Sequence, residues 1–195
     1  MANARFSVAP AYYTGSEVTP EVTVTHSGKT LVKDRDFTVT YHNNIEPSSY
    51  YNSPWVGIDG IGNYQGYVTK SFTINRADIS SCTVTLSDES LTYTGSSLRP
   101  TATVKSGDKE LTLNQDYYVS YRNNWDAGTA SAILTGTGNY TGSVTKDFTI
   151  KPLDISRYSA SLSQYSYTSD GTEKCPDVTV TYGDKTLATG TDFTV

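Results

Sequence analysis

The sequence has few of the residues from which disulfide frameworks, metal sites and catalytic centres are built. Its 195 residues include two cysteines, two histidines, two tryptophans and one methionine. Two cysteines are too few for a zinc site based on cysteine. Nucleophilic catalysis needs a base beside the nucleophile, and neither His26 nor His42 has such a partner by spacing. No serine lies in a nucleophile elbow, although a triad can assemble from residues far apart in sequence. We therefore expect no enzymatic activity, no metal and no cofactor.

The chain also lacks an excess of basic residues and any long apolar run. It has 15 Lys and Arg against 20 Asp and Glu, which gives a formal net charge of −5. A nucleic-acid-binding face needs clustered positive charge to displace phosphate counterions, so we expect no nucleic-acid partner. No stretch is long and apolar enough to span a bilayer, so we expect no membrane insertion.

What the sequence does contain is a repeat of itself. Tyr13-Thr14-Gly15 returns as Tyr93-Thr94-Gly95, and more weakly as Tyr167-Thr168-Ser169. Most of what recurs is best explained as turns and core, because a repeat preserves what its fold needs. The other matched landmarks are Pro20, Pro100 and Pro176; Asp36-Phe37, Asp116-Tyr117 and Asp192-Phe193; Asn43-Asn44 and Asn123-Asn124; Gly62-Asn63-Tyr64 and Gly138-Asn139-Tyr140; and the runs 68–74 and 144–150.

The repeat length predicts the domain organisation. A period of about 80 residues is longer than that of most solenoids, and a unit of this size can close a modest core of its own. We therefore predict one unit over residues 1–76, a second over 77–152 and a truncated third over 153–195. The third unit ends before the counterparts of the last landmarks.

Within each repeat the apolar residues recur with a period of two, which is typical of β-strands. Tyr117, Val119 and Tyr121 share one parity, for example. The second repeat reads as about seven short strands and no segment reads as a helix, which predicts an all-β fold of immunoglobulin-like antiparallel β-sandwiches. The connectors 75–80 and 151–156 are similar to each other, whereas flexible linkers drift toward Gly and Ser. We therefore expect one fixed joint used twice and a tandem, elongated, stiff array.

Two groups of side chains leave alternatives open. Cys82 and Cys175 do not occupy equivalent repeat positions, which favours two free thiols over a structural disulfide. Asp36, Asp116 and Asp192 recur, and carboxylates in loops would suit a calcium ion. The surrounding sequence lacks the Asp, Asn and Gly density of a calcium loop. We therefore favour a structural role, in which each carboxylate accepts backbone amide hydrogen bonds in the turn before its strand.

The order of the motifs resembles that of the bacterial immunoglobulin-like tandem repeats of Gram-positive cell-surface proteins. The resemblance covers nearly the whole chain and rests on Tyr-Thr-Gly, Pro, Val-Thr-Val, Lys-Thr-Leu, Asp-Phe-Thr-Val-Thr-Tyr, Asn-Asn, Gly-Asn-Tyr and Lys-Ser-Phe-Thr-Ile. It implies an extracellular setting on the bacterial surface, where such repeats act as stalk or adhesive modules. The first repeat departs from the pattern, because its residues 45–52 form a longer connection than residues 125–128 of the second.

Lys70 and Lys146 occupy unusual positions. Strand parity places them on the same faces as Phe72 and Phe148, which should be buried. A lysine on a buried face needs a partner, a bulge that turns it outward, or a path along which its amine reaches water. Snorkelling at a sheet edge is favoured over an intramolecular Lys–Asn crosslink. The acceptor candidates for a crosslink to Lys146 are Asn123 and Asn139.

Aromatic residues that do not recur are the best candidates for ligand binding. Tyr50, Tyr51 and Trp55 lie in or beside the longer connection, and the alternation that turns Val56 inward turns Trp55 outward. Exposed rings can stack on sugar faces or anchor a protein interface. Alternatively, Tyr50 or Tyr51 folds back to cover an end of the sandwich. Trp125, in the corresponding loop of the second repeat, is expected to plug a domain junction or end.

Two functions remain after these exclusions. One is a stiff, non-catalytic stalk or spacer of a larger bacterial cell-surface protein. The other is an adhesin segment that binds a host glycan or a host protein, such as mucin or immunoglobulin, through the aromatic loop of the first repeat. No signal peptide is recognisable, and the interrupted third repeat favours a piece of a larger protein over a cytosolic one. That repeat would be ordered by packing on the second or completed by strand-edge association with another molecule.

Overall fold

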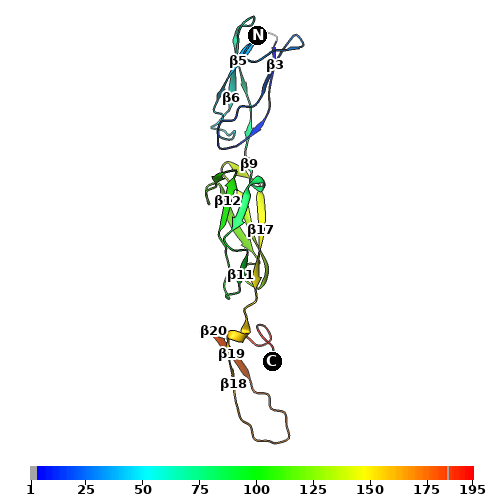
Figure 1. Ribbon diagram of the computed structural model, residues 1–195, viewed down its shortest axis with the longest axis vertical. Coiled ribbons are helices and arrows are strands. Elements are labelled where there is room, and N and C mark those ends of the chain that lie inside the picture. The colour runs from blue at the N-terminus through cyan, green and yellow to red at the C-terminus, as the bar shows by residue number, and fades with distance from the viewer. Residues whose placement is uncertain (1–3, 184) are drawn as a thin grey trace.

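The computed structural model describes residues 4–183 and 185–195. Residues 1–3 of the first predicted unit and Asp184, in a predicted turn of the third, lie outside the described residues. The described chain is all-β, with several small antiparallel sheets and no α-helix. Within these ranges no helix is long and apolar enough to cross a membrane. The repeats follow one another along a single long axis (Figure 1), with the N-terminus at one end and the C-terminus near the third repeat's first helical turn.

The first repeat contains two three-stranded sheets. In one, β3 lies between β1 and β4, and in the other β6 lies between β5 and β7, all antiparallel. A short parallel pair joins β2 to β8. The strands are β1 (Ala4–Val8), β2 (Ala11–Tyr12), β3 (Val22–His26), β4 (Lys29–Thr30), β5 (Phe37–His42), β6 (Trp55–Gly60), β7 (Tyr67–Ser71) and β8 (Ile74–Asn75).

The second repeat has the same plan with a longer final strand. One sheet has the order β10-β12-β13, and the other the order β11-β17-β15-β14, in which β11 runs parallel to β17. The elements are β9 (Ala77–Asp78), the 3-10 turn η1 (Ile79–Ser81), β10 (Thr83–Leu86), β11 (Ser90–Thr92), β12 (Ala102–Ser106), β13 (Lys109–Glu110), β14 (Tyr117–Arg122), β15 (Gly128–Gly136), β16 (Tyr140–Thr141) and β17 (Ser143–Lys151).

The third repeat contains one sheet in the described residues. It begins with the 3-10 turn η2 (Ile155–Arg157) and continues with β18 (Ser159–Leu162), β19 (Val178–Tyr182) and β20 (Lys185–Thr186). These strands pair in the order β18-β19-β20. The segment between β18 and β19 forms an open loop at the far end of the molecule (Figure 1).

The two sheets of the first repeat share one buried cluster. Val24 of β3 lies in it together with Phe37 of β5 and with Val56 and Ile58 of β6, and Leu31 completes it. Burying one such side chain contributes about 1.5–3 kcal/mol relative to leaving it in water. The recurrence of apolar residues at these positions therefore reflects a recurring core. The equivalents in the second repeat are Val104, Tyr117, Ala132, Leu134 and Leu111, all of them buried.

A recurring tyrosine joins the two sheets of each complete repeat. The Tyr41 hydroxyl donates to the carbonyl oxygen of Pro20 at 2.6 Å. The Tyr121 hydroxyl donates to the carbonyl oxygen of Pro100 at the same distance. The first bond links β5 to the segment that leads into β3, and the second links β14 to the segment that leads into β12. This explains why the tyrosine and the proline recur together.

The recurring asparagine pair closes the loop after β5. Asn44 Nδ2 donates to the carbonyl oxygen of Val18 at 3.1 Å, and the Val18 N–H donates to the carbonyl oxygen of Asn44 at 2.7 Å. Asn43 adopts a φ of 55°, in the left-handed region that asparagine tolerates. The predicted turn role is thus confirmed. The second repeat has the same arrangement with Asn124 and Leu98 at 2.8 and 2.7 Å, and with Asn123 at a φ of 52°.

The recurring aspartates stabilise the turn before β5 and its equivalents. Asp36 Oδ2 accepts a hydrogen bond from the Val32 N–H at 2.8 Å. Asp116 and Asp192 accept the same bond from the backbone N–H groups of Thr112 and Ala188, at 2.9 and 2.8 Å. The predicted structural role of these carboxylates is therefore confirmed in all three repeats.

Candidate functional site

The longer connection of the first repeat, predicted over residues 45–52, continues to the start of β6 at Trp55 and is anchored to β8. The Ser48 N–H donates to the carbonyl oxygen of Ile74 at 2.8 Å, and the Ile74 N–H donates to Ser48 Oγ at 3.0 Å. In the second repeat the equivalent Ile150 pairs with Gly128 of β15. The connection thus takes the place of the first residues of that strand. As a result β7 and β8 are separate, whereas β17 is continuous.

Residues Ser49, Tyr50, Tyr51 and Asn52 form a tight turn within this connection, which we call the aromatic turn. The Ser49 N–H donates to the Asn52 carbonyl oxygen at 2.9 Å, and the Asn52 N–H donates to Ser49 Oγ at 3.1 Å. Asn52 Nδ2 donates to the carbonyl oxygen of Glu46 at 2.8 Å. It also reaches the carbonyl oxygens of Asn43 and Pro47 at 3.4 and 3.3 Å.

The two tyrosines of the aromatic turn project into solvent. Tyr50 is 92% exposed and Tyr51 is 94% exposed. Their rings contact each other edge to face, with centroids 5.0 Å apart and an interplanar angle of 87°. Neither ring folds back over an end of the sandwich, which was the alternative that the sequence left open. The fold therefore holds the backbone of the aromatic turn in place but leaves both tyrosine rings exposed.

Trp55 lies at the foot of the same connection, as the first residue of β6. It is half-buried, and its ring stacks on that of His42 with centroids 3.9 Å apart and an interplanar angle of 13°. Val56 and Ile58 are fully buried, so the predicted inward face of this strand is confirmed. Trp55 and His42 together form a second aromatic surface next to the aromatic turn.

Trp125 does not plug a junction. Its side chain is 54% exposed, in the loop between β14 and β15. The hydrogen bond between Asn124 and Leu98 closes this loop and leaves the Trp125 indole outside it. The expectation that Trp125 fills a domain end is therefore wrong.

One buried cluster crosses from the first repeat to the second, and we call this region the first joint. Tyr13, Phe72 and Ile74 lie in the same cluster as Ile79 and Tyr140. The rings of Tyr13 and Tyr140 meet edge to face, with centroids 5.7 Å apart and an interplanar angle of 89°. Ile79 has no exposed surface at all. The first joint is therefore packed like a protein core.

Polar contacts surround the buried centre of the first joint. Lys109 Nζ donates to the Tyr13 hydroxyl at 3.4 Å, and this bond raises the pKa of the Lys109 ammonium above its ordinary value. Asn139 Nδ2 donates to Glu46 Oε2 at 2.6 Å. The Ala77 N–H donates to the carbonyl oxygen of Asn139 at 3.0 Å, where β9 pairs with β16. The connection that carries the aromatic turn thus also contacts the second repeat.

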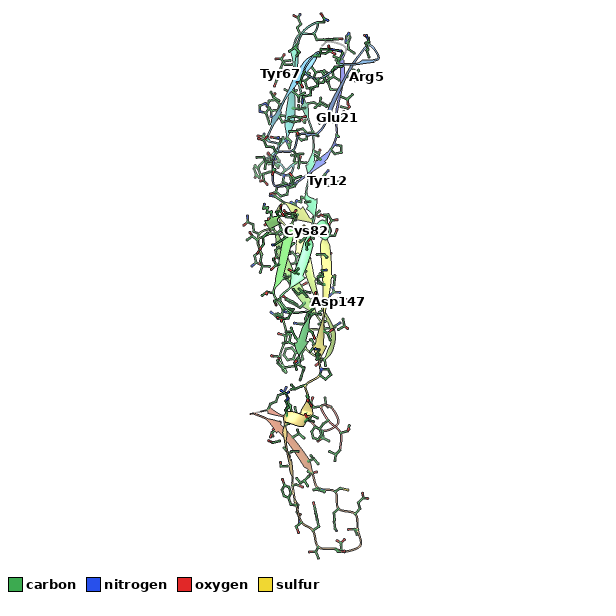
Figure 2. All side chains as sticks on the ribbon, in the orientation of Figure 1. Arg5, Tyr12, Glu21, Tyr67, Cys82 and Asp147 are labelled. Atoms are coloured by element: carbon green, nitrogen blue, oxygen red, sulfur yellow. The ribbon has the colours of Figure 1, made fainter. Side chains whose placement is uncertain are left out.

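The first joint occupies a short stretch of the long axis. Tyr12 and Cys82, both labelled in Figure 2, lie on its two sides.

Burial raises the pKa of the half-buried Cys82 thiol. Because the thiolate is the reactive form, this thiol should react slowly at neutral pH.

The joint between the second and third repeats has one contact in common with the first joint, but it is not packed in the same way. Lys185 Nζ lies 5.1 Å from the ring centroid of Tyr93, which mirrors the 5.7 Å between Lys109 Nζ and Tyr13. Ile155, however, is 43% exposed where its equivalent Ile79 is fully buried. Leucine, isoleucine and tyrosine side chains line a hollow of about 410 Å³ here; its lining includes Tyr93, Leu153, Ile155, Tyr158 and Leu187.

Lys70 and Lys146 both have exposed side chains, so neither is a buried lysine. Lys70 lies on β7, the outer strand of its sheet, and faces Val56 of β6. Lys146 lies opposite Ala132 on β17, whose other neighbour β11 reaches only residues 149–151. Both strands are sheet edges at the lysine, which lets the amine reach water from an apolar face. The crosslink remains the alternative hypothesis, which the intact mass of the protein tests.

Comparison with models of known protein families finds no match, and comparison with curated proteins finds none either. Across residues 4–183 and 185–195, no group of three or more His, Cys, Asp or Glu side chains could hold a metal ion. The candidate sites are the aromatic turn and the first joint.

Sequence reasoning singled out Tyr50, Tyr51 and Trp55 but missed the residues of the joints. The signal for them was available, because Lys29, Lys109 and Lys185 follow the same turn in each repeat. Nothing in that recurrence shows that each lysine contacts a tyrosine of the preceding repeat. The bond between Glu46 and Asn139 had no signal, since Glu46 lies in the connection that does not recur.

Proposed function

We propose that the chain is a non-catalytic stalk or spacer of a larger extracellular protein on a bacterial surface. In this proposal its repeats are tandem immunoglobulin-like β-sandwiches, and the packed first joint keeps the first two of them extended. The observation that carries the proposal is the buried cluster of the first joint, in which Tyr13 and Ile74 pack with Ile79 and Tyr140.

The energy of that cluster is large compared with thermal bending. Each of its large apolar side chains contributes about 1.5–3 kcal/mol through burial, against a thermal energy of about 0.6 kcal/mol. Bending the joint would expose several of them together and would also separate Lys109 from Tyr13. A stalk needs this property, because a flexible linker would let the projected domain fall back toward the surface.

Three further features support the sandwich and its setting. In each complete repeat two sheets share one core, and a tyrosine hydroxyl links them, as in Tyr41 to Pro20. The order of motifs is that of the bacterial surface repeats that the sequence resembles. The net charge of −5 favours solubility outside the cell and does not favour nucleic acid.

Small-angle X-ray scattering of the whole chain tests the stalk. We expect the maximum dimension of an extended rod, and a distance distribution that does not broaden with temperature before unfolding. Inserting three glycines after Asn75 should shorten the mean dimension and broaden the distribution. The same insertion after Gly171, in the open loop of the third repeat, is the matched control and should leave the first two repeats extended. Equal, broad distributions for the unaltered chain and the Asn75 insertion would overturn the proposal.

A further inference from the structure

We propose that the aromatic turn is a binding site for a neutral carbohydrate, in which the rings of Tyr50 and Tyr51 contact the faces of pyranose units. This site is separate from the stalk function and would give the spacer an adhesive surface near its first joint. The starting observation is that the two rings are 92% and 94% exposed although both are large and partly apolar.

The backbone of the aromatic turn is ordered before any ligand arrives. Ser49 and Asn52 close the turn on themselves, and the Asn52 amide donates to the carbonyl oxygen of Glu46. Ser48 then ties the connection to Ile74 by two hydrogen bonds. Ordering a loop on binding lowers affinity, so a turn already held by these bonds presents its rings at a smaller entropic cost.

The chemistry of the turn indicates a neutral ligand. Residues 47–54 contain no charged side chain. The nearest carboxylate in sequence, Glu46, already accepts a hydrogen bond from Asn139. The chain as a whole carries a net charge of −5, which disfavours sulfated or sialylated glycans. What the turn offers is aromatic faces, hydroxyl groups and amides, which suit the C–H faces and hydroxyl groups of a sugar.

The size of the surface favours a sugar over a protein partner. A tyrosine buries about 150–250 Å² at most, so Tyr50 and Tyr51 together offer roughly 300–500 Å². A stable protein interface needs about 800 Å² on each side. The aromatic turn is therefore too small for a protein interface of its own, whereas one or two sugar rings would cover it.

The ring geometry indicates how a sugar would lie. The perpendicular rings, at 87°, give one face to stack on and one edge beside it. The face of an aromatic ring is electronegative and attracts the weakly positive C–H groups of a pyranose face. The stacked pair of His42 and Trp55 begins at the foot of the same turn, since Asn43 Nδ2 donates to the carbonyl oxygen of Ser53 at 3.5 Å. A second sugar unit would meet that surface.

Titration of the whole chain with defined oligosaccharides tests the site. The probes are neutral tetrasaccharides of β-linked glucose, galactose and N-acetylglucosamine, with a sialylated trisaccharide for comparison. Binding of each probe is measured by NMR. We expect saturable binding of at least one neutral probe and weaker binding of the sialylated one. The Tyr50→Ala/Tyr51→Ala double variant should lose at least about tenfold in affinity, which corresponds to about 1.4 kcal/mol. Its thermal unfolding should be unchanged, because neither ring is buried.

Matched variants separate the rings from the hydroxyl groups and from general exposure. Tyr50→Phe/Tyr51→Phe keeps both faces and should retain affinity within about threefold, since the ring supplies the contact. Tyr118→Ala removes another exposed tyrosine, on β14, and should leave affinity unchanged. The proposal is overturned if no neutral probe binds saturably, or if the double alanine variant binds as well as the unaltered chain. Binding to mucin that persists after its glycans are removed would also overturn it, in favour of a protein partner.

Discussion

Lys109 Nζ lies 5.7 Å from the ring centroid of Tyr13 and 3.4 Å from its hydroxyl, so the second repeat places a cation on an aromatic ring of the first. Lys185 Nζ likewise lies 5.1 Å from the ring centroid of Tyr93, one repeat further along. The tyrosine belongs to the Tyr-Thr-Gly motif, and the lysine follows the turn after β12 or β19. Two features that the sequence indicated as turn and core therefore also connect successive repeats.

Replacing Lys109 with methionine should loosen the first joint without unfolding either repeat. Methionine keeps most of the apolar stem but removes the charge that Tyr13 contacts. At an exposed position a cation–π contact contributes about 0.5–1 kcal/mol, so we expect a loss of that size in the free energy of unfolding. Scattering should show a broader distance distribution. Lys105→Met, at an exposed lysine of β12, is the control, and equal effects of the two substitutions would contradict a specific role for Lys109.

Ile79 and Ile155 allow the packing of the two joints to be compared directly. Ile79→Ala should destabilise the chain by about 2–5 kcal/mol, because it leaves a cavity in a fully buried cluster. Ile155→Ala, at the equivalent and 43% exposed position, should cost less than about 0.5 kcal/mol. Denaturant unfolding of the two variants measures both. A similar loss at the two positions would mean that the joints are packed alike in solution.

The same pair shows how far sequence reasoning reaches. Alternation in the strand that follows the aromatic turn predicted the inward residue Val56 correctly, because that pattern is local to the strand. Asp-Ile-Ser occurs in both connectors, yet one isoleucine is buried and the other is not. Ile79 lies in one buried cluster with Tyr140, which is far along the chain, and no local pattern contains such a partner.

Strand pairing and loop closure decide the exposure of the remaining side chains. Parity correctly placed Lys70 and Lys146 opposite buried residues, Val56 and Ala132. The sequence favoured snorkelling at a sheet edge, and the outer position of both strands at those points agrees with that interpretation. The exposure of Trp125 likewise depends on how its loop is closed, and not on the residue type.

Acid should weaken the first repeat through Asp36. Arg35 donates hydrogen bonds to the Asp36 carboxylate, which together with the Val32 N–H lowers the pKa of Asp36. Because this pKa is lowered by folding, the stability it contributes is present above the ordinary value of about 3.9 and is lost as the pH falls through the lowered value. Unfolding temperatures measured between pH 7 and pH 2 should show this loss.

Arg35→Gln tests the cause, since the second repeat has Gln115 at the same place. Without the guanidinium the pKa of Asp36 should rise toward its ordinary value, so the loss of stability in acid should be smaller and should be complete at a higher pH. Asp36→Asn should lack this component of the acid dependence. If the pH profiles of Arg35→Gln and the unaltered chain superimpose, the guanidinium does not set the pKa of Asp36.

Intact mass spectrometry decides the crosslink hypothesis for Lys70 and Lys146. Because both amines reach water at sheet edges, we expect the unmodified mass. An isopeptide bond to an asparagine would remove one ammonia, so each crosslink would lower the mass by that amount. A lowered mass that returns to the calculated value in Lys146→Arg would assign the bond to Lys146 and would contradict the snorkelling interpretation.

The third repeat should associate through its open sheet. All four residues of β18 are exposed, and among the described residues β18 pairs with β19 alone. In the first repeat a second sheet that contains β5 covers the equivalent face, whereas in the described part of the third repeat the equivalent segment forms an isolated bridge between Thr189 and Phe193. An open strand edge beside an uncovered face favours pairing with another chain.

Sedimentation over a range of concentrations measures this association. We expect the average mass to rise with concentration, because pairing through β18 would supply the unpaired backbone groups with partners. Ser159→Lys/Ser161→Lys should keep the chain monomeric, since lysines on an edge strand oppose pairing by charge and by hydration. Ser7→Lys, on the outer strand β1 of the first repeat, is the control and should not change the association. A strictly monomeric unaltered chain would mean that packing on the second repeat alone orders the third.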